Sequence, residues 1–177
     1  MTAPAYGFRP MTAPDIPLVV DWLRRPHVAE WWPWDGSMPG ELERGLTAPW
    51  MRYFLLTLDG EPFMFLQAYD IWKEHACAAT HADAAADGPY DDQPPGTLGV
   101  DQFIGRADLL GQGHGSAAIR RLVDHLLAEG APRVVTDPDP DNPRAVRAYE
   151  KAGFRRLEER DTPDGRVVFM ARDRDEG

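Results

Sequence analysis

Residues 110–128 read LGQGHGSAAIRRLVDHLLA, and they carry the strongest indication of the fold. Three glycines at alternate positions, Gly111, Gly113 and Gly115, precede an amphipathic run from Ala117 to Ala128 that is typical of a helix. Small residues leave the backbone N–H groups bare, and the positive end of the helix dipole lies behind them. The loop therefore predicts a phosphate-binding site, although a plain glycine-rich turn that caps a helix has the same features.

The residues around the glycines limit the kind of phosphate group. A loop that binds a nucleoside triphosphate with magnesium carries Lys and Ser or Thr after its last glycine, whereas Ser116 and Ala117 stand here. A dinucleotide-binding loop lies on the first strand of a βαβ unit, and this loop lies past the middle of the chain. The pyrophosphate of another cofactor fits better, and coenzyme A is the leading candidate.

A second motif lies at residues 136–154, TDPDPDNPRAVRAYEKAGF. It predicts a loop interrupted by prolines and then a short helix. Asp141 or Asn142 would cap this helix, with Pro143 in its first turn, where the missing N–H costs nothing. Gly153 would end the helix in a left-handed conformation.

The glycine loop and the segment from Asn142 to Phe154 together resemble the GNAT superfamily of acyl-CoA-dependent N-acetyltransferases. The resemblance implies an α/β fold, in which helices flank a mixed, mostly antiparallel sheet and acetyl-CoA lies in a splay between strands 97–104 and 133–137. It also implies that backbone amides of the glycine loop hold the coenzyme A pyrophosphate and that Tyr149 faces the thiol. The implied cofactor-binding residues are Phe103, Ile104, Gln112, Gly113, His114, Gly115, Ser116, Asn142 and Ala145.

A narrower resemblance rests on three segments: GVDQFIG at 99–105, TDP at 136–138 and TPDG at 162–165. They look like the corresponding segments of aminoglycoside 6'-N-acetyltransferases, and the similarity runs from Gln67 or so to the C-terminus. This resemblance implies acetylation of the 6'-amino group of an aminoglycoside, and hence antibiotic resistance, with Asp101 beside the accepting amine. The implied acceptor-binding residues are Trp31, Tyr69, Asp87, Tyr90, Asp101, Asp137 and Asp164.

The chain departs from the family pattern in two places, and two other functions stay open. Leu110 stands where many members have Arg or Gln, and Pro89 and Tyr90 stand where the aminoglycoside branch has a tryptophan pair. One alternative is an acyltransferase for a siderophore-type lysine or another small amine. Enzymes of that kind look different on this strand, where they have a histidine near the acceptor and this chain has Asp101. The other is a non-catalytic acyl-CoA-binding sensor, against which Asp101 and Tyr149 argue.

The chemistry needs a base for the ammonium group of the acceptor and an acid for the leaving thiolate. Asp101 is the candidate base, but an ordinary carboxyl pKa of about 4 makes it weak, so that orientation and charge pairing matter more. Tyr149 is the candidate acid, because phenol and thiol pKa values lie within about 2 units of each other. The structural alternatives are a turn cap for Asp101 and a core aromatic for Tyr149.

Charge limits the partners. The chain has 19 basic and 29 acidic residues and a net charge of −10 at pH 7, which repels nucleic acid and anionic membranes and attracts polycations. We therefore expect a small polycationic amine as the substrate, with solubility as the other role of the acidic residues.

Length and composition predict a single domain, residues 1–177, that works as a monomer or a homodimer. No run of 18 apolar residues occurs, and the N-terminal five residues lack the pattern of a signal peptide, so we expect a cytoplasmic protein. The single cysteine, Cys77, cannot form an internal disulfide, and the histidines show no metal-ligand spacing, so no metal is expected.

Periodicity and turn residues predict the remaining elements. The predicted strands are Tyr6–Met11, Arg52–Leu58, Pro62–Tyr69, Thr97–Ile104, Arg133–Asp137, Phe154–Asp161 and Arg166–Ala171. The predicted helices are 12–25, 26–31, 41–48, 142–152 and the helix that begins at Gly113. An Asp59-Gly60 turn joins the second and third strands, and residues 73–96 form a long loop.

Overall fold

The computed structural model describes residues 4–32, 36–73, 90–162 and 165–174, which contain one seven-stranded sheet. Its strand order is β1-β2-β3-β4-β5-β7-β6, and every neighbouring pair is antiparallel except the parallel pair β4 and β5. The predicted mixed, mostly antiparallel sheet is therefore confirmed. The strands are β1 (Tyr6–Pro10), β2 (Met51–Leu58), β3 (Glu61–Asp70), β4 (Leu98–Ile104), β5 (Arg133–Thr136), β6 (Arg155–Thr162) and β7 (Gly165–Asp173).

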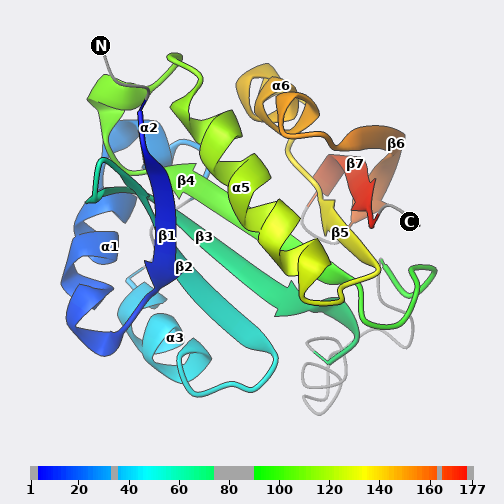
Figure 1. Ribbon diagram of the computed structural model, residues 1–177, viewed down its shortest axis with the longest axis horizontal. Coiled ribbons are helices and arrows are strands. Elements are labelled where there is room, and N and C mark those ends of the chain that lie inside the picture. Colours follow the sequence, from blue (N-terminus) through cyan, green and yellow to red (C-terminus); the bar gives the residue numbers. More distant parts are fainter. Residues whose placement is uncertain (1–3, 33–35, 74–89, 163–164, 175–177) are drawn as a thin grey trace.

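Helices cover both faces of the sheet, and Figure 1 shows α5 lying across it. Side chains alternate between the faces along each strand. In β2, Phe54 and Leu56 pack with α5 and α6, whereas Tyr53 and Leu55 pack with α1 and α3. Each face thus has its own apolar core. The helices are α1 (Ile16–Leu23), α2 (Pro26–Ala29), α3 (Met38–Gly45), α5 (His114–Ala128) and α6 (Pro143–Lys151), with 3-10 turns at Ala13–Asp15 and Ala107–Leu109.

Local turn chemistry joins β2 to β3 as predicted. Asp59 has a φ of 52° and Gly60 a φ of 90°, so both central residues of the turn are left-handed. This geometry matches the right-handed twist of the two strands, and Leu58 pairs directly with Glu61.

Helix α3 differs from the prediction. It spans Met38–Gly45, whereas the sequence pattern indicated residues 41–48. The first turn contains Pro39 and Gly40, two residues that usually interrupt a helix. Proline is tolerated there because the first N–H groups of a helix have no partner within it.

Strands β4 and β5 separate after a short stretch of pairing. Only Leu98 with Val134 and Gly99 with Val135 are in register, and β4 then continues to Ile104 while β5 ends at Thr136. The end of β4 lies against the start of α5, since a Cβ on Gly115 would come within 2.9 Å of the Ile104 Cδ1. The splay between the strands therefore leads to the N-terminus of α5.

Some predictions fall on residues outside the described ranges. These are most of the long loop, with Cys77 and Asp87, and the turn residue Asp164. Within the described ranges, no helix is both long and apolar enough to cross a membrane.

Candidate active site

A cavity of about 1120 Å³ opens where β4 and β5 separate. Side chains from α2, β4, α5, α6 and the segment after β5 line it. Asp101, Asp137 and Tyr149 are among them, so the structure brings Asp101 of β4 to two residues of the motif at 136–154. The two candidate catalytic groups and a candidate acceptor-binding carboxylate thus face one space.

Asp101 is held in β4 by its neighbour in β3. Gln67 pairs with Asp101 across the two strands, and its Nε2 donates a hydrogen bond to the Asp101 Oδ2 at 2.8 Å. Desolvation by the surrounding protein raises the pKa of Asp101, and the opposing hydrogen bonds from Gln67 and Tyr69 do not cancel it. The expectation of an ordinary carboxyl pKa was wrong, because the sequence does not show how closely protein surrounds this group. Asp101 is thus a stronger base than we expected.

Tyr149 belongs to the apolar core and to the cavity wall at once. Its side chain is 4% exposed and packs edge to face on Phe154, with ring centroids 5.3 Å apart. Burial first, and the nearby Asp101 charge second, raise the pKa of Tyr149, while hydrogen bonds with Thr136 and Gln102 oppose them. The phenol therefore stays protonated at neutral pH and is a weaker acid than a free tyrosine.

The glycine loop leaves open space in front of α5. Gly113 caps this 15-residue helix with a φ of 86°, and Gly111 has a φ of 75°. A Cβ on either glycine would meet no atom within 4 Å. The first N–H groups of the helix have no partner within it, and they carry the positive end of the dipole. This arrangement fits a pyrophosphate.

Side chains of the loop contact protein. The Tyr6 hydroxyl and the His114 Nδ1 share a hydrogen bond at 2.9 Å, and Ser116 Oγ donates to the Gly113 carbonyl at 3.0 Å. Gln112 Nε2 donates to the Asp108 carbonyl. These contacts occupy the polar side chains of the loop, so its backbone N–H groups stay a prediction for the anion-binding groups.

The predicted cofactor residues divide into two groups. Phe103, Ile104, Gly115, Asn142 and Ala145 line the cavity, whereas Gln112, Gly113, His114 and Ser116 are not among its described lining residues. Asn142 also caps α6, because its Oδ1 accepts a hydrogen bond from the Ala145 N–H at 3.1 Å.

The predicted acceptor residues also divide. Trp31 lines the cavity and is 41% exposed, while Trp32 beside it packs edge to face on Phe103. Tyr69 and Tyr90 are not among the described lining residues. Tyr69 instead lies over Gly99, where a Cβ would come within 2.5 Å of its ring.

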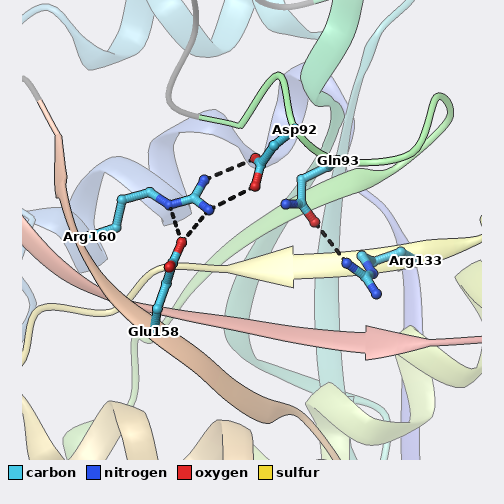
Figure 2. Close-up of polar contacts among 5 residues, drawn as sticks. All are labelled: Asp92, Gln93, Arg133, Glu158 and Arg160. Carbon is cyan, nitrogen blue, oxygen red and sulfur yellow. Dashed lines mark hydrogen bonds and ion pairs between the residues drawn. The ribbon is translucent and has the colours of Figure 1, made fainter.

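Tyr90 contacts a residue of the cavity wall. Its hydroxyl donates a hydrogen bond to the Asp137 Oδ2, and its ring stacks on Phe169. Burial, followed by the charge of Asp137, raises the pKa of Tyr90, so its hydroxyl remains a donor. Figure 2 shows the polar contacts that two other residues of this segment, Asp92 and Gln93, form with arginines of the sheet.

Several residues of the site were missed in the sequence. Gln67 contacts Asp101, and Arg144 and Arg147 line the cavity from α6. The signal for the arginines was the helical spacing of three from one to the other, on a helix that the motif already predicted. No local signal pointed to Gln67, because its role depends on the register of β3 against β4.

The described residues contain no group of three His, Cys, Asp or Glu side chains that could hold a metal ion.

Comparisons with known proteins agree with this geometry. The model of the family described as "Acetyltransferase (GNAT) domain" matches residues 12–162. Aminoglycoside N(6')-acetyltransferase type 1 of Klebsiella pneumoniae is 34% identical over 175 residues, which cover 94% of this chain and 82% of that protein. Lysine N-acyltransferase MbtK of Mycolicibacterium paratuberculosis is 31% identical over 176 residues, covering 96% and 74%. The crystal structure of aminoglycoside acetyltransferase AAC(6')-Ib in complex with coenzyme A and kanamycin has a TM-score of 0.80 at 33% identity, covering 96% of this chain and 95% of that one.

Proposed function

The chain belongs to the GNAT acetyltransferase family, and on this premise we propose that it transfers the acetyl group of acetyl-CoA to the 6'-amino group of an aminoglycoside. The observation that carries the proposal is the meeting of Asp101, Asp137 and Tyr149 on the wall of one cavity. Two carboxylates in that wall suit an acceptor with several ammonium groups, and the net charge of −10 favours its approach.

In this proposal, acetyl-CoA binds along the gap between β4 and β5. The backbone amides after Gly113 hold the pyrophosphate, and the widening gap between β4 and β5 takes the pantetheine arm. Acetyl-CoA, when bound, supplies the acetyl thioester. Ile104 and Asn142 line the cavity beside this path.

Asp101 and Tyr149 divide the proton transfers between them. The Asp101 carboxylate, with its raised pKa, accepts a proton from the 6'-ammonium group, and the free amine attacks the thioester carbonyl. As the C–S bond breaks, the Tyr149 phenol donates a proton to the sulfur, the nitrogen loses its second proton to solvent, and solvent returns a proton to the phenolate. Because burial makes this phenol a weak acid, the transfer occurs as the negative charge develops on the sulfur.

The relative that acylates lysine is the basis of the other candidate. It is nearly as similar to this chain as the aminoglycoside enzyme is. Asp101 together with Asp137 favours the aminoglycoside, because two carboxylates on one cavity wall suit an acceptor with several ammonium groups, whereas a lysine side chain carries one.

Steady-state kinetics with two acceptors test the proposal. Kanamycin and methyl 6-amino-6-deoxyglucoside carry the same reacting amine, but only kanamycin carries further ammonium groups. We expect a KM for kanamycin at least about tenfold lower, since each added charge pair with a carboxylate is worth roughly 1.5–3 kcal/mol. This KM should rise as NaCl increases from about 50 mM to about 500 mM, because salt screens partly exposed charge pairs.

Two results would overturn the proposal. One is equal kcat/KM for kanamycin and the monoamine sugar. The other is a higher kcat/KM for a lysine-derived siderophore precursor than for kanamycin, which would favour the lysine acyltransferase.

Tyr149→Phe tests the acid. This change removes only the phenolic proton, and we expect kcat to fall by about 10²-fold. The Kd for acetyl-CoA from calorimetry should stay within about twofold, because the ring remains in the core. Single-turnover measurement separates loss of chemistry from slow product release. An unchanged single-turnover rate would show that solvent protonates the sulfur.

A further inference from the structure

Tyr90 contacts Asp137, although Tyr90 is not among the described residues that line the cavity. Asp137 follows β5 and lines the cavity, and its Oδ2 accepts a hydrogen bond from the Tyr90 hydroxyl. The Tyr90 ring stacks on the fully buried Phe169 of β7, with an interplanar angle of 18° and centroids 5.2 Å apart. Tyr90 therefore links the carboxylate to the core of the sheet.

Arg160 of β6 holds the segment that carries Tyr90, because it forms an ion pair with Asp92 of that segment. Its two terminal nitrogens donate to the two carboxylate oxygens of Asp92, at 3.1 and 3.0 Å, and its Nε donates to Glu158 at 2.9 Å (Figure 2). The guanidinium also lies 4.3 Å from the centroid of the Phe169 ring, and the side chain is 17% exposed. A bidentate contact of this kind fixes the orientation of the guanidinium and the carboxylate as well as the distance between them.

A second arginine holds the same segment one residue further on. Arg133 of β5 donates to the Gln93 Oε1 at 3.0 Å, and Gln93 is 6% exposed (Figure 2). Asp173 holds Arg133 in turn, with its Oδ1 2.6 Å from the Arg133 Nε. Residues 90–93 are thus attached to β5, β6 and β7.

Charge explains why an arginine is needed here. Asp92 and Glu158 both lie within hydrogen-bonding distance of Arg160, and like charges repel. Arg160 stands between Asp92 and Glu158 and attracts both. Without it, the repulsion would push the segment of Asp92, and Tyr90 with it, away from β6.

We propose that Arg160 and Tyr90 are positioning residues for acceptor recognition: Arg160 keeps Tyr90 in place, and the Tyr90 hydroxyl aims the Asp137 carboxylate at an ammonium group remote from the reacting amine. The consequence for substrate choice rests on the proposed function, whereas the contact between Tyr90 and Asp137 does not.

Nuclear magnetic resonance tests, without any acceptor present, whether Arg160 and Tyr90 position the Asp137 carboxylate. The protein is labelled with carbon-13 at the aspartate carboxyl groups, and Asp137→Asn assigns the Asp137 signal by its loss. We expect Tyr90→Phe to shift this signal, because the carboxylate loses a hydrogen bond. Arg160→Met should shift it in the same direction, and the two changes together should add nothing further.

Kinetics with kanamycin test the consequence. Tyr90→Phe and Arg160→Met should each raise the KM by about fivefold to tenfold, with kcat and the Kd of acetyl-CoA nearly unchanged. The double variant should match the larger single effect, because both substitutions break one chain of contacts. Arg160→Lys keeps the positive charge but loses the bidentate geometry, so its KM for kanamycin should lie between those of the wild type and Arg160→Met. The KM of methyl 6-amino-6-deoxyglucoside should not change.

Arg166→Met is the matched control. Arg166 lies on the same hairpin, where it is paired with Asp161 and so projects from the opposite face to Arg160, and it forms a surface ion pair with Glu159. It should change neither the Asp137 signal nor the KM.

Three outcomes would overturn the proposal. They are an unshifted Asp137 signal in Arg160→Met, additive effects of the two substitutions, and a loss of kcat equal for both acceptors. If the wild-type protein does not acetylate kanamycin, the proposed function fails, and the carbon-13 signal still decides whether Arg160 and Tyr90 position Asp137.

Discussion

Asp101→Asn is expected to lower kcat with kanamycin by about 10³-fold, because the amide cannot accept the proton of the reacting ammonium group. Asparagine has nearly the same shape, and its oxygen can still accept the hydrogen bond of Gln67. The kcat/KM of the wild type should rise with pH through the raised pKa of Asp101, above the usual carboxyl range. In the variant this rise should disappear. A pH profile of both proteins is the measurement, and a variant that keeps the rise would assign the base to another group.

The same substitution should stabilise the protein at neutral pH. A carboxyl whose pKa is raised in the folded state binds its proton more tightly there than in the unfolded chain. Its burial therefore costs nothing below the unfolded pKa of about 3.9, and the cost grows as pH rises through the folded pKa. Asp101→Asn should raise the Tm at pH 7 and change it little at pH 3.

Melting curves at the two pH values measure this effect. Asp21→Asn is the control, since Asp21 pairs with Arg25 on the surface of α1 and 64% of its side chain is exposed. It should not raise the Tm at either pH. A lower Tm for Asp101→Asn at pH 7 would mean that Asp101 contributes to stability as an ion, contrary to its raised pKa.

Gly113→Asp is expected to weaken acetyl-CoA binding by about 10²-fold or more, since an unpaired like charge in a binding site costs several kcal/mol. Its φ of 86° is one that L side chains rarely adopt, and the carboxylate would stand at the positive end of α5, where the pyrophosphate belongs. Calorimetry with acetyl-CoA, without acceptor, is the measurement.

Two controls separate charge from strain. Gly113→Ala keeps the strain and adds no charge, so it should bind more tightly than Gly113→Asp. Gly130→Asp places the same residue after the other end of α5, where the glycine has a φ of 115° and open space. It should leave the Kd unchanged. Similar Kd values for the wild type and Gly113→Asp would place the pyrophosphate elsewhere.

Local features were predictable wherever neighbouring residues decide the structure. The Asp59-Gly60 turn forms because both residues tolerate a left-handed backbone, and the helices α5 and α6 follow from their periodicity and caps. Even there, Pro39 and Gly40 hid the first turn of α3, because a proline that is harmless at a helix start looks like an interruption.

The site was predictable only in part, for a different reason. The family resemblance pointed to Asp101, Tyr149 and Asp137, and these three line one cavity. The resemblance did not indicate that the Tyr90 hydroxyl contacts Asp137 or that the Tyr90 ring stacks on Phe169. A stacking partner almost eighty residues away leaves no trace in the sequence around Tyr90.

The fold class, the family and the helix end that suits a pyrophosphate could be predicted from the sequence, because they depend on backbone conformation and on residues a few positions apart. The raised pKa of Asp101, its hydrogen bond from Gln67, and the attachment of residues 90–93 by Arg133 and Arg160 depend on the tertiary structure. Desolvation and ion pairing act over a few ångströms through space. Which groups come that close is set by strand register and by the order of strands in the sheet.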